Sequence, residues 1–516
     1  MVAREDRERR LRGALAQRGT RRSPASLWVG LLLIAAAVVL FMDIVGGIAL
    51  PVPRLYPRAM ALAGLVACMT VAWRPKWAVP LFIVVMAPLR TLSLPRQISP
   101  MGVPMSALAL SIVALAAFWW LWPTRPRKLE RMSRADVVMT ALYLLFAASA
   151  IPALLARPYG SSSPVVNRII FVHGVLLPVI LFLVIRSWLR TYKDPTTIAR
   201  ALLASCIVAL ASGVVQIYAK GLGVSNSSEA SMFRYDLLGF AGANNSGIIL
   251  VMLYPLVFLV FPRGSKLGTL ATSLGALGFW AIGIVSLSRS TPIVLGIETL
   301  AVLALSARRM AVTQVLLCLC LAGGLALSMA PDSFVQTWTD RFRETDLLGH
   351  ITGNARRVSP ADQYRFQIQR ELLYQIKQRP QGGYGATGTV DPENLYLDTG
   401  LQFGWAALAL LLILQAYALG LSLVTSRRGP PVEREVAKSF LVGTLGAVLY
   451  GVTTGVNLVK VADPHGRLGY APNGIVSVVI AIFMALLVTV ALERTRPPRF
   501  VSLRQPRPPS GAAQPV

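Results

Sequence analysis

Runs of roughly twenty apolar residues recur along almost the whole chain, and they constrain its fold more than any other feature. A run of this length, folded as an α-helix, matches the thickness of the hydrocarbon core of a lipid bilayer. Inside that core every backbone N–H and C=O group must be bonded within the protein, and a helix achieves this by itself. The sequence therefore predicts an all-α protein that crosses a membrane many times.

The composition agrees with a membrane protein. Only 14% of the 516 residues are charged and 54% are hydrophobic, and the mean hydropathy is +0.58. A soluble protein would carry about 25% charged residues. The net charge of +28 does not indicate nucleic-acid binding, because the basic residues form short clusters between the apolar runs. We therefore expect no nucleic-acid partner.

The apolar runs predict fourteen membrane spans, with both chain ends on one side. The spans lie near residues 27–49, 56–73, 77–95, 103–122, 135–157, 167–188, 199–219, 240–262, 267–286, 290–307, 311–331, 399–424, 437–458 and 473–493. Every second connection is basic, which is typical of cytoplasmic loops. Both ends are therefore expected in the cytoplasm, and the first run is long enough to be a span rather than a cleaved signal peptide.

This topology divides the chain into five parts. They are a basic cytoplasmic tail (1–26), the first eleven spans (27–331), a periplasmic loop (332–398), the last three spans (399–493) and a second cytoplasmic tail (494–516). Both tails are polar and basic, and the second is also rich in proline. Such compositions are typical of disordered segments.

The polar segment at 365–405 lies between apolar runs and belongs mostly to the periplasmic loop. Residues 364–379 contain neither proline nor glycine, which favours a helix, and Pro380 with the glycines after it would end that helix. Four apolar residues are expected to share one helical face: Phe366, Leu372, Leu373 and Ile376. We predict a helix on the outer membrane surface, followed by a tight turn. Such a segment adds little stability to a membrane protein, so it is a candidate for binding or chemistry.

Arginines on the outer side are the strongest candidates for a binding site, because the positive charge of the chain otherwise stays inside. Arg289 lies in a connection (286–291) so short that it must be at the membrane boundary, where an arginine needs a partner. Its guanidinium group can hold phosphate oxygens in a bidentate fork. It could instead extend into water or pair with Glu298, which is itself expected as a polar contact between helices. Arg234 is either a second phosphate ligand or a solvated loop residue.

Glu393 and Asn394 lie just before the span at 399–424. Glu393 is either an acid stabilised by a helix N-terminus or a general base that accepts a hydroxyl proton. Asn394 is equally consistent with a helix cap. Four more polar residues are expected near the same surface: Asn245, Arg365, Arg370 and Tyr384.

Neither the cysteines nor the histidines form a pattern that is typical of a metal site. The cysteines all lie inside apolar runs and are expected to be packing residues: Cys68, Cys206, Cys318 and Cys320. His350 and His465 are expected on the outer side, but they are not grouped with other metal ligands. We therefore expect no disulfide, no metal ion and no cofactor.

The order of these features resembles that of the O-antigen ligase and O-antigen (Wzy-type) polymerase superfamily of membrane glycosyltransferases. The likeness covers about residues 230–420 and rests on short motifs in a fixed order. The matching positions are Asn244 and Asn245 at a span start, the pair Ser288 and Arg289, Arg365 and Pro380 at the family's interval, and the turn at 380–385. Many members carry His-Asn where this chain has Glu393 and Asn394, and this departure favours a polymerase over a ligase.

The resemblance implies a GT-C-like fold and an inverting transfer of a glycan from undecaprenyl diphosphate, at the periplasmic face of a bacterial inner membrane. Arg234, Arg289 and Arg365 would bind the diphosphate, and Arg289 would stabilise the charge on this leaving group. Glu393 would accept the proton of the acceptor hydroxyl. Supporting positions would be Asn245, Arg370, Tyr384 and Asn394. Such enzymes work without a metal ion, and a chain-length regulator is a candidate partner.

Two other classes of protein remain open. A transporter of lipid-linked oligosaccharides suits fourteen spans, but transporters usually place polar residues near the bilayer midplane and often contain repeats. Here the polar residues collect at the outer boundary and in one loop. A structural membrane subunit is the third class, and the polar segment at 365–405 argues against it.

Overall fold

The computed structural model describes residues 74–91, 107–121, 133–155, 164–220, 243–260, 266–286, 288–305, 316, 335–336, 339, 360–384, 394–429, 431–454, 460–462, 471–473 and 475–492. Several sequence predictions lie outside these residues. They are the two tails, the spans near 27–49 and 56–73, and nearly all of the span near 311–331.

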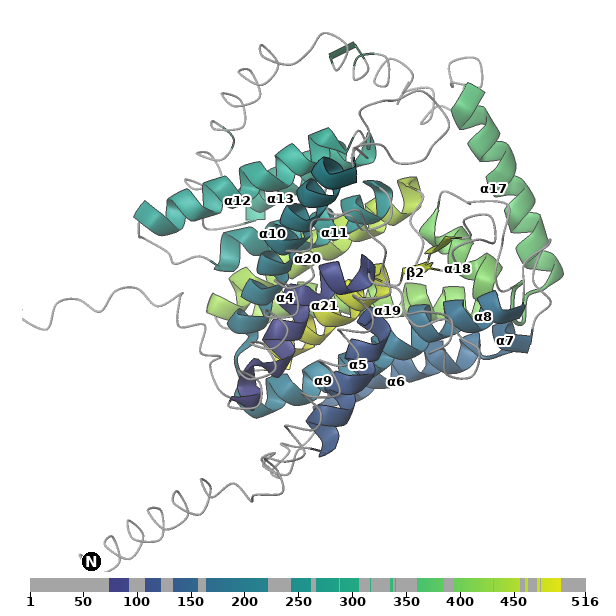
Figure 1. The fold of residues 1–516 in the computed structure, drawn as a ribbon, viewed down its shortest axis with the longest axis horizontal. Helices are drawn as coiled ribbons and strands as arrows, with labels where there is room; N and C mark the ends of the chain where they lie inside the picture. The colour runs from purple at the N-terminus through teal and green to yellow at the C-terminus, as the bar shows by residue number, and fades with distance from the viewer. Residues whose placement is uncertain are drawn as a thin grey trace, which may run out of the picture.

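Helices make up nearly all of the described chain (Figure 1). The α-helices are α4 (Ala78–Thr91), α5 (Ala107–Leu121), α6 (Arg134–Ala150), α7 (Pro152–Leu155), α8 (Pro164–Phe171), α9 (Leu177–Tyr192), α10 (Pro195–Lys220), α11 (Ala243–Val260), α12 (Lys266–Val285), α13 (Ser290–Leu305), α17 (Pro360–Gln378), α18 (Leu395–Phe403), α19 (Trp405–Arg428), α20 (Pro431–Thr453) and α21 (Ile475–Leu492). A 3-10 helix, η1 (Pro75–Trp77), precedes α4, and a π-helix, η4 (Val172–Leu176), joins α8 to α9. Two short strands, β1 (Lys460–Ala462) and β2 (Ala471–Asn473), pair antiparallel.

Within the described residues, five helices are long and apolar enough to cross a membrane. They are Arg134–Leu154, Asn167–Tyr192, Leu267–Ile284, Trp405–Arg428 and Glu433–Thr453. Shorter apolar helices coincide with most of the other predicted spans: Pro75–Met86, Leu108–Leu121, Pro195–Leu210, Asn244–Val260, Ser290–Leu305 and Ile475–Ala491. The all-helical fold and the presence of helices long and apolar enough to cross a membrane are therefore confirmed, while the total of fourteen spans stays a prediction.

Helix α21 lies in the middle of the bundle, and α6, α9, α10, α11, α19 and α20 contact it (Figure 1). All of its residues from 475 to 491 are buried, except the half-buried Ile480. The outer helices instead expose large apolar side chains, for example Leu145 on α6, Leu274 on α12 and Ile413 on α19. Side chains of this kind on the outside of a helical bundle suit contact with lipid.

A buried ion pair links α6, α9 and α21 at one end of the bundle. Arg186 of α9 donates from Nε to Oδ1 of Asp136 on α6 (2.7 Å), and its Nη2 donates to the same oxygen. Its Nη1 donates to the carbonyl of Ala485 (3.3 Å) and to the hydroxyl of Thr489, both on α21. The start of α6 thus meets the later parts of α9 and α21. Helices that cross a membrane in alternate directions, as predicted, would meet in this way.

The predicted loop helix is present as α17, and it packs on α18 at the edge of the bundle (Figure 1). Leu372 and Ile376 are buried against Leu401 of α18 and Tyr384, with Ile368 beside them. The predicted apolar face is therefore wrong in one member, because Leu373 is 39% exposed. The side chain of Phe366 lies outside the described part of the structure.

The predicted span at 399–424 is interrupted, which corrects its expected start. Helix α18 ends at Phe403 and α19 begins at Trp405, with Gly404 between them at φ 88°. A side chain on Gly404 would meet the Gly382 amide nitrogen and the Pro380 carbonyl at 2.6 and 2.7 Å. Glycine is needed here because the turn after α17 approaches the backbone so closely.

Candidate functional site

Three hydroxyl groups from two distant parts of the chain meet where α12 is followed by α13. The Tyr450 hydroxyl of α20 lies 3.0 Å from the Ser288 hydroxyl and 3.0 Å from the Thr291 hydroxyl. We call Ser288, Thr291 and Tyr450 the hydroxyl cluster. Tyr450 and Thr291 are both fully buried, and Ser288 is 4% exposed. These hydrogen bonds fix the short connection on which Arg289 lies.

Helix α11 also contacts the hydroxyl cluster, in addition to α13 and α20. Ser288 donates to Oδ1 of Asn244 at the start of α11 (3.4 Å), and Asn245 beside it is buried. Gly247, near the start of α11, lies against the Tyr450 hydroxyl so closely that a side chain there would collide with it. The small residues after Asn245 therefore allow α20 to come close to α11.

Arg289 itself is half-buried, between the buried residues Ser288 and Thr291. One alternative for its role, a pair with Glu298, is wrong. Neither carboxyl oxygen of Glu298 has a hydrogen-bond partner among the residues that the structure describes. Arg289 therefore lies at the end of the bundle on a connection held by three buried hydroxyls, while Glu298 lies further along α13.

The last turn of α20 connects the hydroxyl cluster to α18. Asn394 donates from Nδ2 to the carbonyl of Val452 (3.0 Å), two residues after Tyr450. Asn394 is also the N-cap of α18, and its Oδ1 accepts from the amides of Tyr396 (2.9 Å) and Leu397 (3.2 Å). Its interpretation as a cap is therefore confirmed, and the same side chain also holds α18 against α20.

Tyr396 continues this contact toward α19. Its ring lies against Gly451, and its hydroxyl donates to Oε1 of Gln415 (2.9 Å). Burial raises the pKa of Tyr396 to about 12, although its hydrogen bond to Gln415 lowers the pKa in part. The phenol therefore stays protonated at neutral pH and acts as a hydrogen-bond donor that positions α18.

The turn at 380–384 and the exposed face of α17 form a separate group of residues. The Tyr384 amide donates to the Leu401 carbonyl (2.7 Å), its ring lies 4.6 Å from the Arg379 guanidinium, and its hydroxyl donates weakly to Gln378 (3.5 Å). Tyr384 thereby fastens the turn to α18. Arg370 is exposed on α17.

The structure brings only some of the predicted site residues together. Asn245, Arg289 and Asn394 are placed at or next to the hydroxyl cluster through α11, α13 and α20, whereas Arg370 and Tyr384 belong to the α17 and α18 contact. Arg234 and Glu393 lie outside the described residues, as does the side chain of Arg365, whose backbone is in α17.

Tyr450 is the functional candidate that sequence reasoning missed. It lies inside a predicted span, among apolar residues that give no sign of a polar partner. The available signal was the sequence just after it, where Gly451, Thr453 and Thr454 make the end of the span unusually small and polar.

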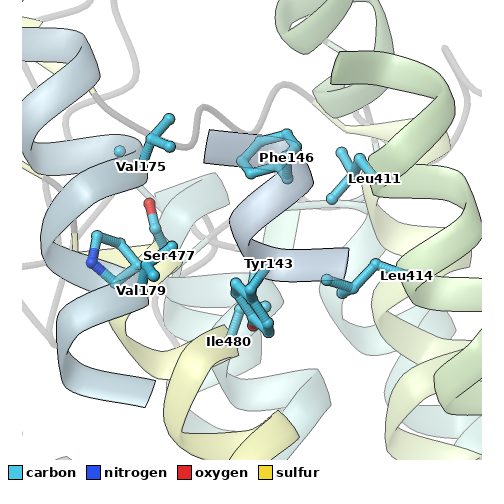
Figure 2. Close-up of a pocket in the computed structure, with 10 residues that line it drawn as sticks. Tyr143, Phe146, Val175, Val179, Leu411, Leu414, Ser477 and Ile480 are labelled. Carbon is cyan, nitrogen blue, oxygen red and sulfur yellow. The ribbon is translucent and has the colours of Figure 1, made fainter. Parts of the chain in front are cut away.

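An apolar pocket lies elsewhere in the bundle, among α6, η4, α9, α19 and α21 (Figure 2). Its labelled lining residues include Tyr143 and Phe146 from α6, Val175 from η4, and Leu411 and Leu414 from α19. Gly174 in the π-helix also borders it, and a π-helix is a local widening of the helix that often marks a functional site. The lining suits a hydrocarbon chain rather than a polar ligand.

Neither a comparison with protein-family models nor one with curated proteins finds a match to this chain. Within the described part of the structure, no three His, Cys, Asp or Glu residues gather as metal ligands would. Arguments about function therefore rest on the chain's own residues.

Proposed function

We propose that this protein is an inverting glycosyltransferase of GT-C-like fold that uses a glycan on undecaprenyl diphosphate as donor. A polysaccharide polymerase is favoured and an O-antigen ligase is next. One observation carries the proposal: segments at 244–247, 286–291, 394–396 and 450–452 converge at one end of a membrane bundle. Three of these four segments are the ones that carry the family resemblance.

Arg289 is the proposed diphosphate ligand within this arrangement. A connection held by buried hydrogen bonds at Ser288 and Thr291 keeps the backbone of Arg289 in one place, so less of its freedom is lost when it binds an anion. Arg234 and Arg365 are proposed as further ligands. Guanidinium groups that are fixed before the reaction stabilise the diphosphate as negative charge grows on it.

The proposed reaction is a single displacement. A hydroxyl oxygen of the acceptor sugar attacks the anomeric carbon of the donor, and the bond from that carbon to the diphosphate oxygen breaks. The hydroxyl proton passes to the Glu393 carboxylate, and undecaprenyl diphosphate leaves with the bonding electron pair. Attack opposite the leaving group inverts the anomeric configuration. The polyprenyl chain would lie among the spans, where the apolar pocket of Figure 2 is a candidate position.

The topology is part of the proposal. We place both chain ends in the cytoplasm of a bacterium, with fourteen spans in its inner membrane and the hydroxyl cluster at the periplasmic face. The buried pair of Arg186 and Asp136 supports alternate crossing directions for α6, α9 and α21, which this topology requires. The clustering of basic residues in every second connection supports the cytoplasmic position of the ends.

Reconstitution with a synthetic undecaprenyl-diphosphate oligosaccharide tests this function. A ladder of products indicates a polymerase, and a single transfer to an added core oligosaccharide indicates a ligase. Arg289→Ala is expected to lower turnover by about 10²–10³-fold, as the loss of one charge-stabilising donor does. Arg427→Ala is the matched control, because Arg427 is exposed near the end of α19 and has no part in the proposed site. If neither the wild-type protein nor the control variant forms any product, the proposed function is contradicted.

A transporter of lipid-linked oligosaccharides is the second candidate, and Glu298 is the observation that favours it. An acidic residue buried deep among membrane helices is often part of a transport or proton pathway. If the protein moves a fluorescent lipid-linked oligosaccharide across the membrane of proteoliposomes and transfers no glycan, the transporter is the correct function.

A further inference from the structure

Glu298 lies inside the helical bundle, and no residue that the structure describes offers it a compensating charge. It is in α13, 1% exposed, and neither of its carboxyl oxygens has a hydrogen-bond partner in the described part of the chain. An ionised carboxylate in such a place costs several kcal/mol unless a cation or several donors stabilise it. The ionised form is therefore the unfavourable one here.

The helices that pack on α13 offer no cation to this carboxyl among the described residues. They are α11, α12 and α20. The titratable group of α11 is Tyr254, whose hydroxyl is bonded to that of Thr299 (2.7 Å). Helix α12 has no acid or base after Lys266. Helix α20 carries its charged residues among its first eight, and Tyr450 of the hydroxyl cluster is near its other end.

The space around the Glu298 carboxyl fits a neutral acid. The carboxyl lies against Gly446 of α20, where a side chain would collide with it, and the Cγ1 methyl of Val251 on α11 lies against the same glycine. The immediate neighbours of the carboxyl group are therefore a glycine and an apolar side chain.

We infer that Glu298 is a proton-binding site within the membrane. Its carboxyl group carries a proton at neutral pH, because the buried site offers the ionised form no cation among the described residues. The bound proton allows α13 and α20 to pack closely at Gly446. Release of the proton requires water to reach the carboxyl, and therefore requires α13 and α20 to separate there. This inference does not depend on glycosyl transfer.

Infrared spectroscopy of the full-length protein in lipid tests the inference directly. The difference between wild-type and Glu298→Gln at neutral pH is expected to contain the C=O stretching band of a protonated carboxylic acid, and this band should shift in D₂O. Glutamine has nearly the same shape and no charge, so the variant should fold. Carboxylate stretching bands in place of the acid band would overturn the inference.

Labelling with dicyclohexylcarbodiimide gives a second measurement that needs only wild-type protein. The acid proton moves to a nitrogen of the reagent and the carboxyl oxygen bonds to its central carbon, so that an adduct forms without a leaving group. At about pH 8 exposed glutamates are ionised, since their ordinary pKa is about 4.3. Mass spectrometry should then find the adduct on Glu298 and not on Glu371, which is exposed on α17. Labelling of Glu371 without Glu298 would overturn the inference.

Discussion

Removal of one oxygen atom, in Tyr450→Phe, tests whether the hydroxyl cluster holds the connection that carries Arg289. The substitution breaks the bonds from Tyr450 to Ser288 and Thr291, which are both 3.0 Å long. Ser288 keeps its bond to Asn244, but Thr291 is fully buried and loses the partner that Tyr450 supplied. A buried hydroxyl without a partner costs about 1–3 kcal/mol, so the free energy of unfolding should fall by about that amount.

Turnover should fall as well, because Arg289 lies between the two residues that lose a partner. A misplacement of about 1 Å in a charge-stabilising group can cost about 10²-fold in rate, and we expect a loss of up to this size. Unfolding in micelles with increasing denaturing detergent, followed by tryptophan fluorescence, measures the first effect. Product formation from the lipid-linked donor measures the second.

The matched control is Tyr374→Phe, since Tyr374 is 63% exposed on α17. If Tyr450→Phe unfolds at the same detergent fraction as this control, the reasoning about the buried hydroxyls is refuted. If the stability falls but turnover is unchanged, the cluster supports the fold and has no part in the chemistry.

Three other substitutions test features of the fold. Arg186→Ala should destabilise the protein by about 3–5 kcal/mol, because it leaves the Asp136 carboxylate buried without its cation, and the double variant Arg186→Leu with Asp136→Leu should recover most of this loss in the same unfolding assay. Gly383→Ala should expose the turn after α17 to limited proteolysis, because φ is 61° and the new Cβ would lie 2.5 Å from the Leu401 carbonyl; Gly420→Ala, with nothing within 4 Å, should not. Burial raises the pKa of Asp194, but the Thr197 and Lys76 hydrogen bonds lower it below its ordinary value of 3.8. The stabilisation by Asp194 is therefore complete above that value and is lost as the pH falls below it, so the melting temperatures of wild-type and Lys76→Met protein should converge below about pH 4.

Sequence reasoning located the helices well because bilayer thickness sets their length. The expected spans at 267–286 and 437–458 agree with Leu267–Ile284 and Glu433–Thr453 to within a few residues. The break at Gly404 could not be predicted from apolar periodicity, because residues on both sides of it are apolar. Its cause is tertiary, since the Trp405 amide donates to the Pro380 carbonyl (2.9 Å) across the turn.

The hydroxyl cluster was predictable only in part. Ser288, Thr291 and Asn244 lie at the ends of predicted spans, and alternate crossing directions place those ends on one side of the membrane. Tyr450 was missed because the small and polar residues after it mark the end of the span, but they do not distinguish a tyrosine that packs against lipid from one that bonds to another helix. The packing of α20 against both α11 and α13 makes that distinction.

The hydroxyl cluster and the Glu298 site both lie in the contact between α13 and α20. Thr291 bonds to Tyr450, and further along the same two helices Glu298 lies against Gly446, which is one helical turn from Tyr450. If the bound proton at Glu298 fixes how closely these helices approach, the position of the Tyr450 hydroxyl depends on it. A double-mutant cycle of Glu298→Asp with Tyr450→Phe should then give a coupling of about 0.5–3 kcal/mol in the free energy of unfolding. Aspartate keeps the acid but is one methylene shorter, so it should loosen the contact at Gly446 without removing the titratable group. Additive effects would mean that the two contacts are independent, and that protonation of Glu298 has no influence on the connection that carries Arg289.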